Sequence, residues 1–186
     1  MIHLQCTHAV LKYFGMVPRD TAHAENTGAL LGNWSATNFL VDRRRVFLFM
    51  SDKTLLSFVL TEGEKKFDLA RLQPLLENGL AQLLTFMKVP PQSVEAAVAD
   101  LDVISLTKTK DRALVGNLNA LANDYSQHIW QQGGLRSCNL TAIILGVNDG
   151  PQRRLGWSSA ARITHELLAA ERSALAVRAL QVLPKT

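Results

Sequence analysis

Residues 39–60, "FLVDRRRVFLFMSDKTLLSFVL", carry the strongest fold signal in this chain. Three apolar runs rich in β-branched and aromatic side chains are separated by two short polar interruptions, which is typical of antiparallel strands joined by tight turns. The polar residues 42–45 lie at or beside the first turn, and Asp52 and Lys53 lie at the second. The stretch therefore predicts an antiparallel meander with three consecutive arginines, Arg43, Arg44 and Arg45, near its first bend.

On both sides of the meander, hydrophobic periodicity predicts the other elements. Alternation at 1–6 predicts a strand, and Thr7 is a suitable N-cap for a short helix after it. Proline favours the first turn of a helix, so Pro74 is expected to begin one, and Gly79 inside that helix is expected to mark a close contact. The other expected elements are a short helix at 92–101, a strand at 102–109, a long helix at 112–132, a segment at 140–146 that fits either a strand or a helix, and a last helix from Ser158 or Ser159 to near Pro184.

The size and composition of the chain favour one domain. The 186 residues are 47% hydrophobic and 19% charged, which is enough apolar material for a sizeable core. We expect an α+β fold: a small, mostly antiparallel sheet of four to five strands packed against several helices. No apolar run approaches the roughly 18 residues that span a bilayer, and the N-terminus has no basic segment before an apolar block. We therefore expect no membrane contact and a cytoplasmic location, with Cys6 and Cys138 as free thiols.

The net charge of +4 suits a polyanionic partner but does not by itself indicate one. All of the positive excess lies after residue 100. Aromatic residues make up only 6% of the chain, and apart from the arginine triplet the basic residues are scattered. A dedicated nucleic-acid binder usually has denser basic clusters.

The helix at 112–132 has an apolar face and a polar flank without lysine or glutamate. At 100° per residue, one face collects Leu114, Val115, Leu118, Leu121, Ala122, Tyr125 and Ile129. Arg112, Asn119 and Asn123 are predicted to lie beside that face. Amides next to a core must be hydrogen-bonded, so this flank is either a structural seam to the sheet or part of a ligand site.

The last helix is predicted to be apolar on two sides. Ile163, Leu167, Ala170, Ala174 and Val177 form one stripe, and Leu168 and Leu175 form a second. Such a helix is often packed between two partners. Burial within one chain and a homodimer through this helix are both open.

The sequence carries no strong enzyme signature. It contains no P-loop, no dinucleotide-binding glycine pattern and no nucleophile elbow. His3, Cys6 and His8 are possible zinc ligands, but strand alternation turns His3 away from Cys6 and no second cluster accompanies them. We expect no metal and no cofactor.

Several motifs resemble a mainly bacterial family of domains of unknown function. The matching residues are Cys6-Thr7, Leu31-Gly32, Trp34, Ala36, Phe39, Asp42-Arg43-Arg44, Thr54-Leu55, Ser57, Arg112, Gly116 and Asn119. The resemblance covers roughly residues 1–150 and leaves 151–186 as a C-terminal helical extension, which we expect to pack on the same domain. It implies no activity.

The arginine triplet and the polar flank lead to two functional hypotheses. In the first, the protein is a non-catalytic binding module for an anionic partner, nucleic acid or protein. Its site would consist of Arg43, Arg44, Arg112, Asn119, Asn123 and Trp34, since arginine binds phosphate and carboxylate groups in a planar fork. In the alternative, it is a small enzyme acting on a phosphorylated or nucleic-acid substrate. The residues for proton transfer would then be Lys108, Asp111 and His128.

Overall fold

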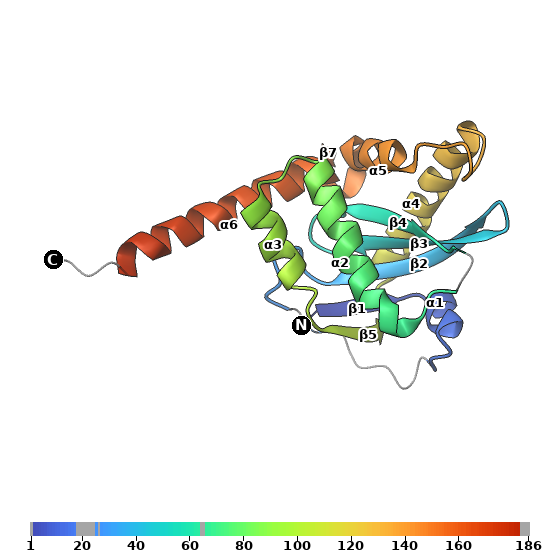
Figure 1. Cartoon of the computed structure of the whole chain (residues 1–186), viewed down its shortest axis with the longest axis horizontal. Helices are drawn as coiled ribbons and strands as arrows, with labels where there is room; N and C mark the ends of the chain where they lie inside the picture. The colour runs from blue at the N-terminus through green and yellow to red at the C-terminus, as the bar shows by residue number, and fades with distance from the viewer. Residues whose placement is uncertain (1, 18–24, 26, 64–65, 183–186) are drawn as a thin grey trace.

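The computed structural model describes residues 2–17, 25, 27–63 and 66–182, and a five-stranded sheet forms its centre (Figure 1). The strand order is β4-β3-β2-β1-β5. The strands are β1 (Ile2–Cys6), β2 (Trp34–Val41), β3 (Arg44–Ser51), β4 (Ser57–Thr61) and β5 (Ile104–Lys108). The α+β class and the antiparallel meander are confirmed, because β2, β3 and β4 pair in sequence order. The sheet is mixed, since β1 runs parallel to both of its neighbours, β2 and β5.

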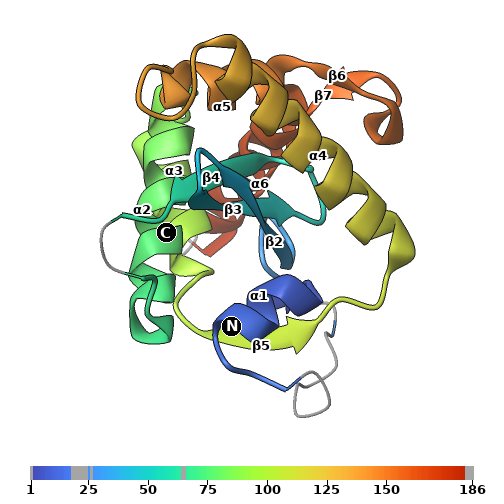
Figure 2. The same ribbon diagram turned by 90° about the vertical axis from the view of Figure 1, so that its right-hand side faces the viewer.

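Helices cover both faces of the sheet. They are α1 (His8–Tyr13), α2 (Leu69–Phe86), α3 (Pro91–Ala99), α4 (Arg112–Gln131), α5 (Leu140–Asp149) and α6 (Ala160–Val182). A small hairpin of β6 (Pro151–Gln152) and β7 (Ser158–Ser159) encloses a 3-10 turn, η2 (Arg153–Leu155). Figure 2 shows α2 and α3 on one side of the sheet and α4 on the other. None of the helices in these described ranges has both the length and the apolar composition needed to cross a membrane.

Each face of the sheet has its own core. The first core joins β1, β2 and β3 residues such as Leu4, Trp34 and Phe49 to α1, α2 and α3. The second joins Leu48, Met50 and Val59 to the inner faces of α4 and α5. Helix α6 reaches the first core through Leu168, which is buried, while its outer half projects from the body of the molecule (Figure 1).

Two local expectations need correction or completion. Pro74 does not begin α2, because the helix starts at Leu69, where the side chain of Asp68 accepts a hydrogen bond from the Ala70 N–H as its N-cap. The ambiguous segment at 140–146 is helical and belongs to α5. Its N-cap is Asn139, whose side chain accepts a hydrogen bond from the Ala142 N–H.

The expected close contact at Gly79 is confirmed. A Cβ atom at this position of α2 would lie 2.5 Å from Cε2 of Phe58, whose ring is buried on β4. The absence of a side chain therefore sets how closely α2 approaches the edge of the sheet.

We expect Gly79→Ala to lower the free energy of unfolding by about 1–2 kcal/mol. Overpacking a core typically costs about 1–3 kcal/mol, and the higher helix propensity of alanine returns up to about 1 kcal/mol of this. Gly116→Ala on α4 is the matched control, because that glycine is exposed and a Cβ atom there would meet no other atom within 4 Å. The control should gain about 0.5–1 kcal/mol. Urea unfolding measures both, and stabilisation by both substitutions would show that the Phe58 contact imposes no constraint.

Candidate functional site

The β2–β3 turn consists of only Asp42 and Arg43, both with left-handed backbone conformation (φ 51° and 62°). A two-residue turn of this kind matches the twist of the strands, and it favours Gly and Asn at both positions. Asp42 is used structurally: its Oδ2 accepts a hydrogen bond of 2.8 Å from the Leu135 N–H. The turn is thereby attached to the loop that follows α4, where Gly134 lies against the same carboxylate.

This attachment brings Arg136 to the same end of the molecule as Arg43 and Arg44. All three side chains are exposed, and no ion pair links any of them to another described residue. The Asp42 carboxylate bonds to the Leu135 amide, has no ion pair with any of the three arginines and offsets only one of their three positive charges. We call Arg43, Arg44 and Arg136 the arginine tip.

Arg45, the third member of the triplet, has a different role. Its guanidinium donates to Asn38 Oδ1 at 2.8 Å, lies 5.2 Å from the centre of the Tyr13 ring and is 4.0 Å from Glu62. These contacts join the meander to α1 and leave Arg45 outside the arginine tip.

The outer face of α4 begins with Arg112 and ends beside the arginine tip. Arg112, Asn119, Asn123 and Trp130 lie within about 40° of one another around the helix at 100° per residue. All four are exposed, and Trp130 retains 63% of its surface. They span about 27 Å along the axis at 1.5 Å per residue. We call these four residues the α4 stripe.

The expectation that these amides lie beside the core is wrong. The buried face of α4 contains Leu114, Leu118, Leu121, Tyr125 and Ile129 only. Val115 and Ala122 are half-buried at its margin, so the apolar face is narrower than the sequence pattern indicates. Asn119 and Asn123 consequently point to solvent and form no structural seam.

Trp34 lies apart from the other proposed binding residues. It is 2% exposed and packs edge-on against Phe58, 5.6 Å between ring centres, in the core between β2 and α2. It also begins β2, whereas Arg43 and Arg44 follow the end of that strand. The arginine tip and the α4 stripe therefore contain five of the six proposed residues.

The three residues suggested for proton transfer do not converge. The Asp111 carboxylate accepts a hydrogen bond from the Ala113 N–H as the N-cap of α4. His128 is exposed on the last turns of α4, where its Nδ1 lies 2.7 Å from the Asp124 carbonyl oxygen. Lys108 is exposed at the end of β5. The described residues also contain no group of three or more His, Cys, Asp and Glu side chains arranged to hold a metal ion.

The structure adds a polar area that the sequence reasoning missed. Alternate residues of β5, of β1 and of the first half of β2, with the residues next to the strand ends, face the α4 side of the sheet and are polar. By register they form three rows: Ser105, His3 and Asn33; Thr107, Gln5 and Ser35; Thr109, Thr7 and Thr37. Each strand shows this alternation in the sequence, but only the pairing puts the polar sides together. We call these nine residues the polar rows.

Asp52 lies beside the polar rows and is their one carboxylate partner among the described hydrogen bonds. Its oxygens accept hydrogen bonds from Gln5 Nε2 at 2.5 Å and Ser35 Oγ at 2.8 Å. Burial raises the pKa of Asp52 to about 6, although both hydrogen bonds and the charge of Arg154 act in the opposite direction. Asp52 is thus a carboxyl group that takes up a proton near pH 6.

Other polar atoms of this area have no partner within the described part of the chain. They are His3 Nδ1, Thr107 Oγ1 and Thr109 Oγ1, all on residues at most 9% exposed. Cys6 on the opposite side of β1 is a core residue, as strand alternation predicts, and its burial raises the pKa of the thiol to about 12. It is therefore not an activated nucleophile.

Residues 3–162 match the model of a family described as Domain of unknown function (DUF6933). The match extends 12 residues past position 150 and ends within the first turn of α6. A comparison with curated proteins finds no match.

Proposed function

We propose that this protein, which belongs to the family Domain of unknown function (DUF6933), is a non-catalytic binding protein. It binds an anionic partner, either nucleic acid or an acidic protein. The binding surface consists of the arginine tip and the α4 stripe. The observation that carries this proposal is the docking of Asp42 on Leu135, which gathers Arg43, Arg44 and Arg136. None of the three has an ion pair with a described residue.

The backbone at Arg43 supports a role for its side chain. A residue other than glycine in the left-handed region costs about 1 kcal/mol or more, and the turn itself would be better served by glycine or asparagine. A glycine or asparagine at position 43 would form this turn at least as well as the arginine does. Its long side chain, held at an exposed hairpin end, is suited to reach a phosphate or carboxylate group.

The α4 stripe supplies the rest of the proposed surface. Asn119 and Asn123 offer neutral hydrogen-bond donors and acceptors, and Trp130 offers an exposed ring in the last turn of α4, before the loop that contains Arg136. Exposed aromatic rings beside basic side chains suit nucleic-acid bases as well as protein side chains. No acidic residue lies on the stripe.

A salt titration tests this proposal with three probes: single-stranded DNA, duplex DNA and polyglutamate. We expect binding at low salt that weakens linearly as log affinity against log salt. A triple Arg43→Ala, Arg44→Ala, Arg136→Ala variant should give a slope for a DNA probe that is shallower by about 2–3, since each lost phosphate contact removes about 0.7–0.9. Fluorescence anisotropy measures affinity and slope together.

The matched control removes the same charge elsewhere. Arg71, Arg172 and Arg178 are exposed on α2 and α6, and their triple alanine variant should keep the original slope. Absence of binding to all three probes at low salt, or an equal loss in both triple variants, would rule out a site at the arginine tip.

Two further expectations about the protein stay predictions. A cytoplasmic location is one, and a homodimer through the last helix is the other. Leu175 and Val177 on the projecting half of α6 are 50% and 54% exposed, which suits a second copy but does not require one.

A further inference from the structure

Strand β4 forms one edge of the sheet. Every second residue of β4 has its backbone N–H and C=O directed away from β3, where no further strand follows. The Ser51 N–H donates to the Leu56 carbonyl, and the Glu62 N–H donates to the Arg45 carbonyl. In this antiparallel register, the even-numbered residues of β4 therefore bond to β3. The N–H and C=O groups of Ser57, Val59 and Thr61 point away from the sheet.

At Ser57 a side-chain amide occupies the place of a neighbouring strand. Asn148 Oδ1 accepts a hydrogen bond from the Ser57 N–H at 2.8 Å, and Asn148 Nδ2 donates to the Ser57 carbonyl at 2.7 Å. Asn148 belongs to α5 and is fully buried. A neighbouring strand would make the same two bonds with its backbone N–H and C=O. The side-chain amide of Asn148 therefore already satisfies the outward backbone groups of Ser57, the first residue of β4.

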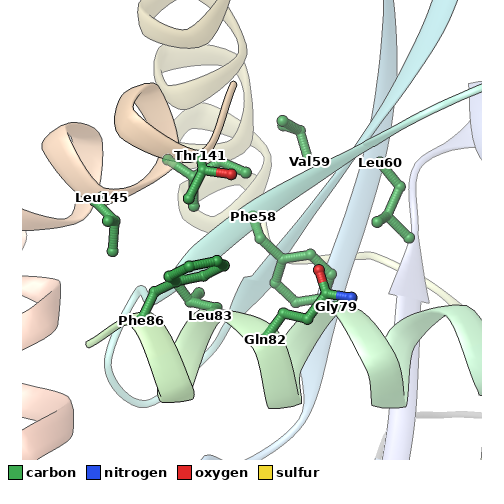
Figure 3. A pocket seen from close by; sticks show the side chains of 10 residues that line it. Phe58, Val59, Leu60, Gly79, Gln82, Leu83, Phe86, Thr141 and Leu145 are labelled. Atoms are coloured by element: carbon green, nitrogen blue, oxygen red, sulfur yellow. The ribbon is translucent and has the colours of Figure 1, made fainter. Parts of the chain in front are cut away.

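At Val59 no described residue makes the corresponding bonds. Instead Val59 lines a groove of about 70 Å³ between α2 and α5. Figure 3 shows Leu83 and Phe86 on the α2 side and Thr141 and Leu145 on the α5 side, with β4 between them. Phe86, at the mouth, is 55% exposed.

The lining of this groove is uncharged throughout. It consists of Phe58, Val59, Leu60, Gly79, Gln82, Leu83, Phe86, Thr141, Ile144 and Leu145. A charged occupant would lose its hydration without gaining a counter-ion, so the groove selects a neutral one. An apolar molecule without amides would leave the Val59 N–H and C=O unpaired, which costs about 1–3 kcal/mol per buried group.

We propose that this groove binds an extended, uncharged peptide segment of a partner protein, which adds a strand to the β4 edge. The segment pairs its backbone with Val59 and continues toward Thr61. The Asn148 cap at Ser57 ends the pairing in the other direction. A residue opposite Val59 directs its side chain toward α5, and its two neighbours direct theirs toward Leu83 and Phe86 on α2, as alternation in a strand requires.

The test selects ligands from a phage-displayed library of random nine-residue peptides. We expect enriched peptides with apolar residues at alternate positions and no charge in the central five. A synthetic copy of an enriched peptide, titrated by NMR, should slow amide exchange at Val59 at least tenfold. N-methylation of the peptide residue that pairs with Val59 should abolish binding.

Neighbouring positions on α5 provide matched variants. Thr141 lines the groove and Ala142 does not, while both are exposed in the first turn of the helix, where glutamate is well tolerated. Thr141→Glu should weaken peptide binding at least tenfold, and Ala142→Glu should change it less than twofold. The triple alanine variant of the arginine tip should bind the peptide normally, which separates this site from the proposed anion site.

Three results of the peptide selection would overturn the proposal. They are no enrichment from the library, enriched peptides that bind Thr141→Glu as well as they bind the unaltered protein, and peptides that protect other amides but not Val59. Concentration-dependent protection of Val59 without any peptide, together with dimers in sedimentation, would identify a second copy as the occupant and would equally contradict it.

Discussion

Replacing Asn148 with alanine is expected to lower the free energy of unfolding by about 3–4 kcal/mol. The substitution leaves the Ser57 N–H buried without an acceptor and removes the Asn148 bonds to the carbonyls of Ser57 and Ile144. An unsatisfied buried group costs about 1–3 kcal/mol, and a lost neutral hydrogen bond adds about 1 kcal/mol. The Ser57 carbonyl keeps one donor, the hydroxyl of Tyr125 at 3.1 Å.

Two further variants make this measurement specific. Tyr125→Phe removes only the hydroxyl, which bonds to the Ser57 side chain and carbonyl and to the Asn148 side chain, and should cost about 1–3 kcal/mol. Asp149→Ala alters the exposed next residue of α5 and should stay within about 0.5 kcal/mol. Urea unfolding followed by circular dichroism gives all three values. A loss below 1 kcal/mol for Asn148→Ala would show that water replaces the amide at the β4 edge.

Replacing Asp52 with asparagine is expected to stabilise the protein at neutral pH by up to about 3 kcal/mol. Burial raises the pKa of Asp52 from 3.8 to about 6, so the folded protein favours the protonated carboxyl. Each pKa unit corresponds to about 1.4 kcal/mol. The stabilisation by the protonated form is complete below about pH 4 and is lost as the pH rises through about 6. Asparagine is neutral at every pH and retains a partner for Gln5 and Ser35.

The difference between the variant and the original protein isolates this effect. The free-energy difference should be near zero at pH 4, grow between pH 4 and 7 and be constant above pH 7. Asp102→Asn, at an exposed position, corrects for the change in net charge. Thermal unfolding across this range measures both variants. A difference that is independent of pH would mean that the Asp52 carboxyl is ionised with its ordinary affinity for protons.

Local patterns in the sequence determined much of this fold. The alternation and turn residues of 39–60 correctly predict an antiparallel meander of three strands, because adjacent antiparallel strands need only short-range signals. The bounds differ, since β2 begins at Trp34 and β4 begins only at Ser57. The 3.6-residue periodicity predicts α4 to within one residue. Gly79 was identified from its unfavourable place in a helix, since local propensity conflicted there with the pattern around it.

Only the tertiary structure determines which of these strands and helices are in contact. The parallel pairing of β1 with β2 and β5 joins segments up to about 100 residues apart, and no local pattern specifies it. The polar rows follow from that pairing alone. So does the burial of Asp52 beside Gln5, 47 positions away in the chain.

The same distinction separates the proposed sites. The sequence predicts an exposed turn at Arg43 and Arg44, but it does not place Arg136 beside them, because a hydrogen bond between residues 93 positions apart makes that contact. The Ser57 cap by Asn148 spans 91 positions. Interactions between residues a few positions apart determine whether a segment prefers a strand, a helix or a turn, so these preferences can be predicted from the sequence. The proposed sites depend on contacts between distant segments, which no pattern within a few residues specifies.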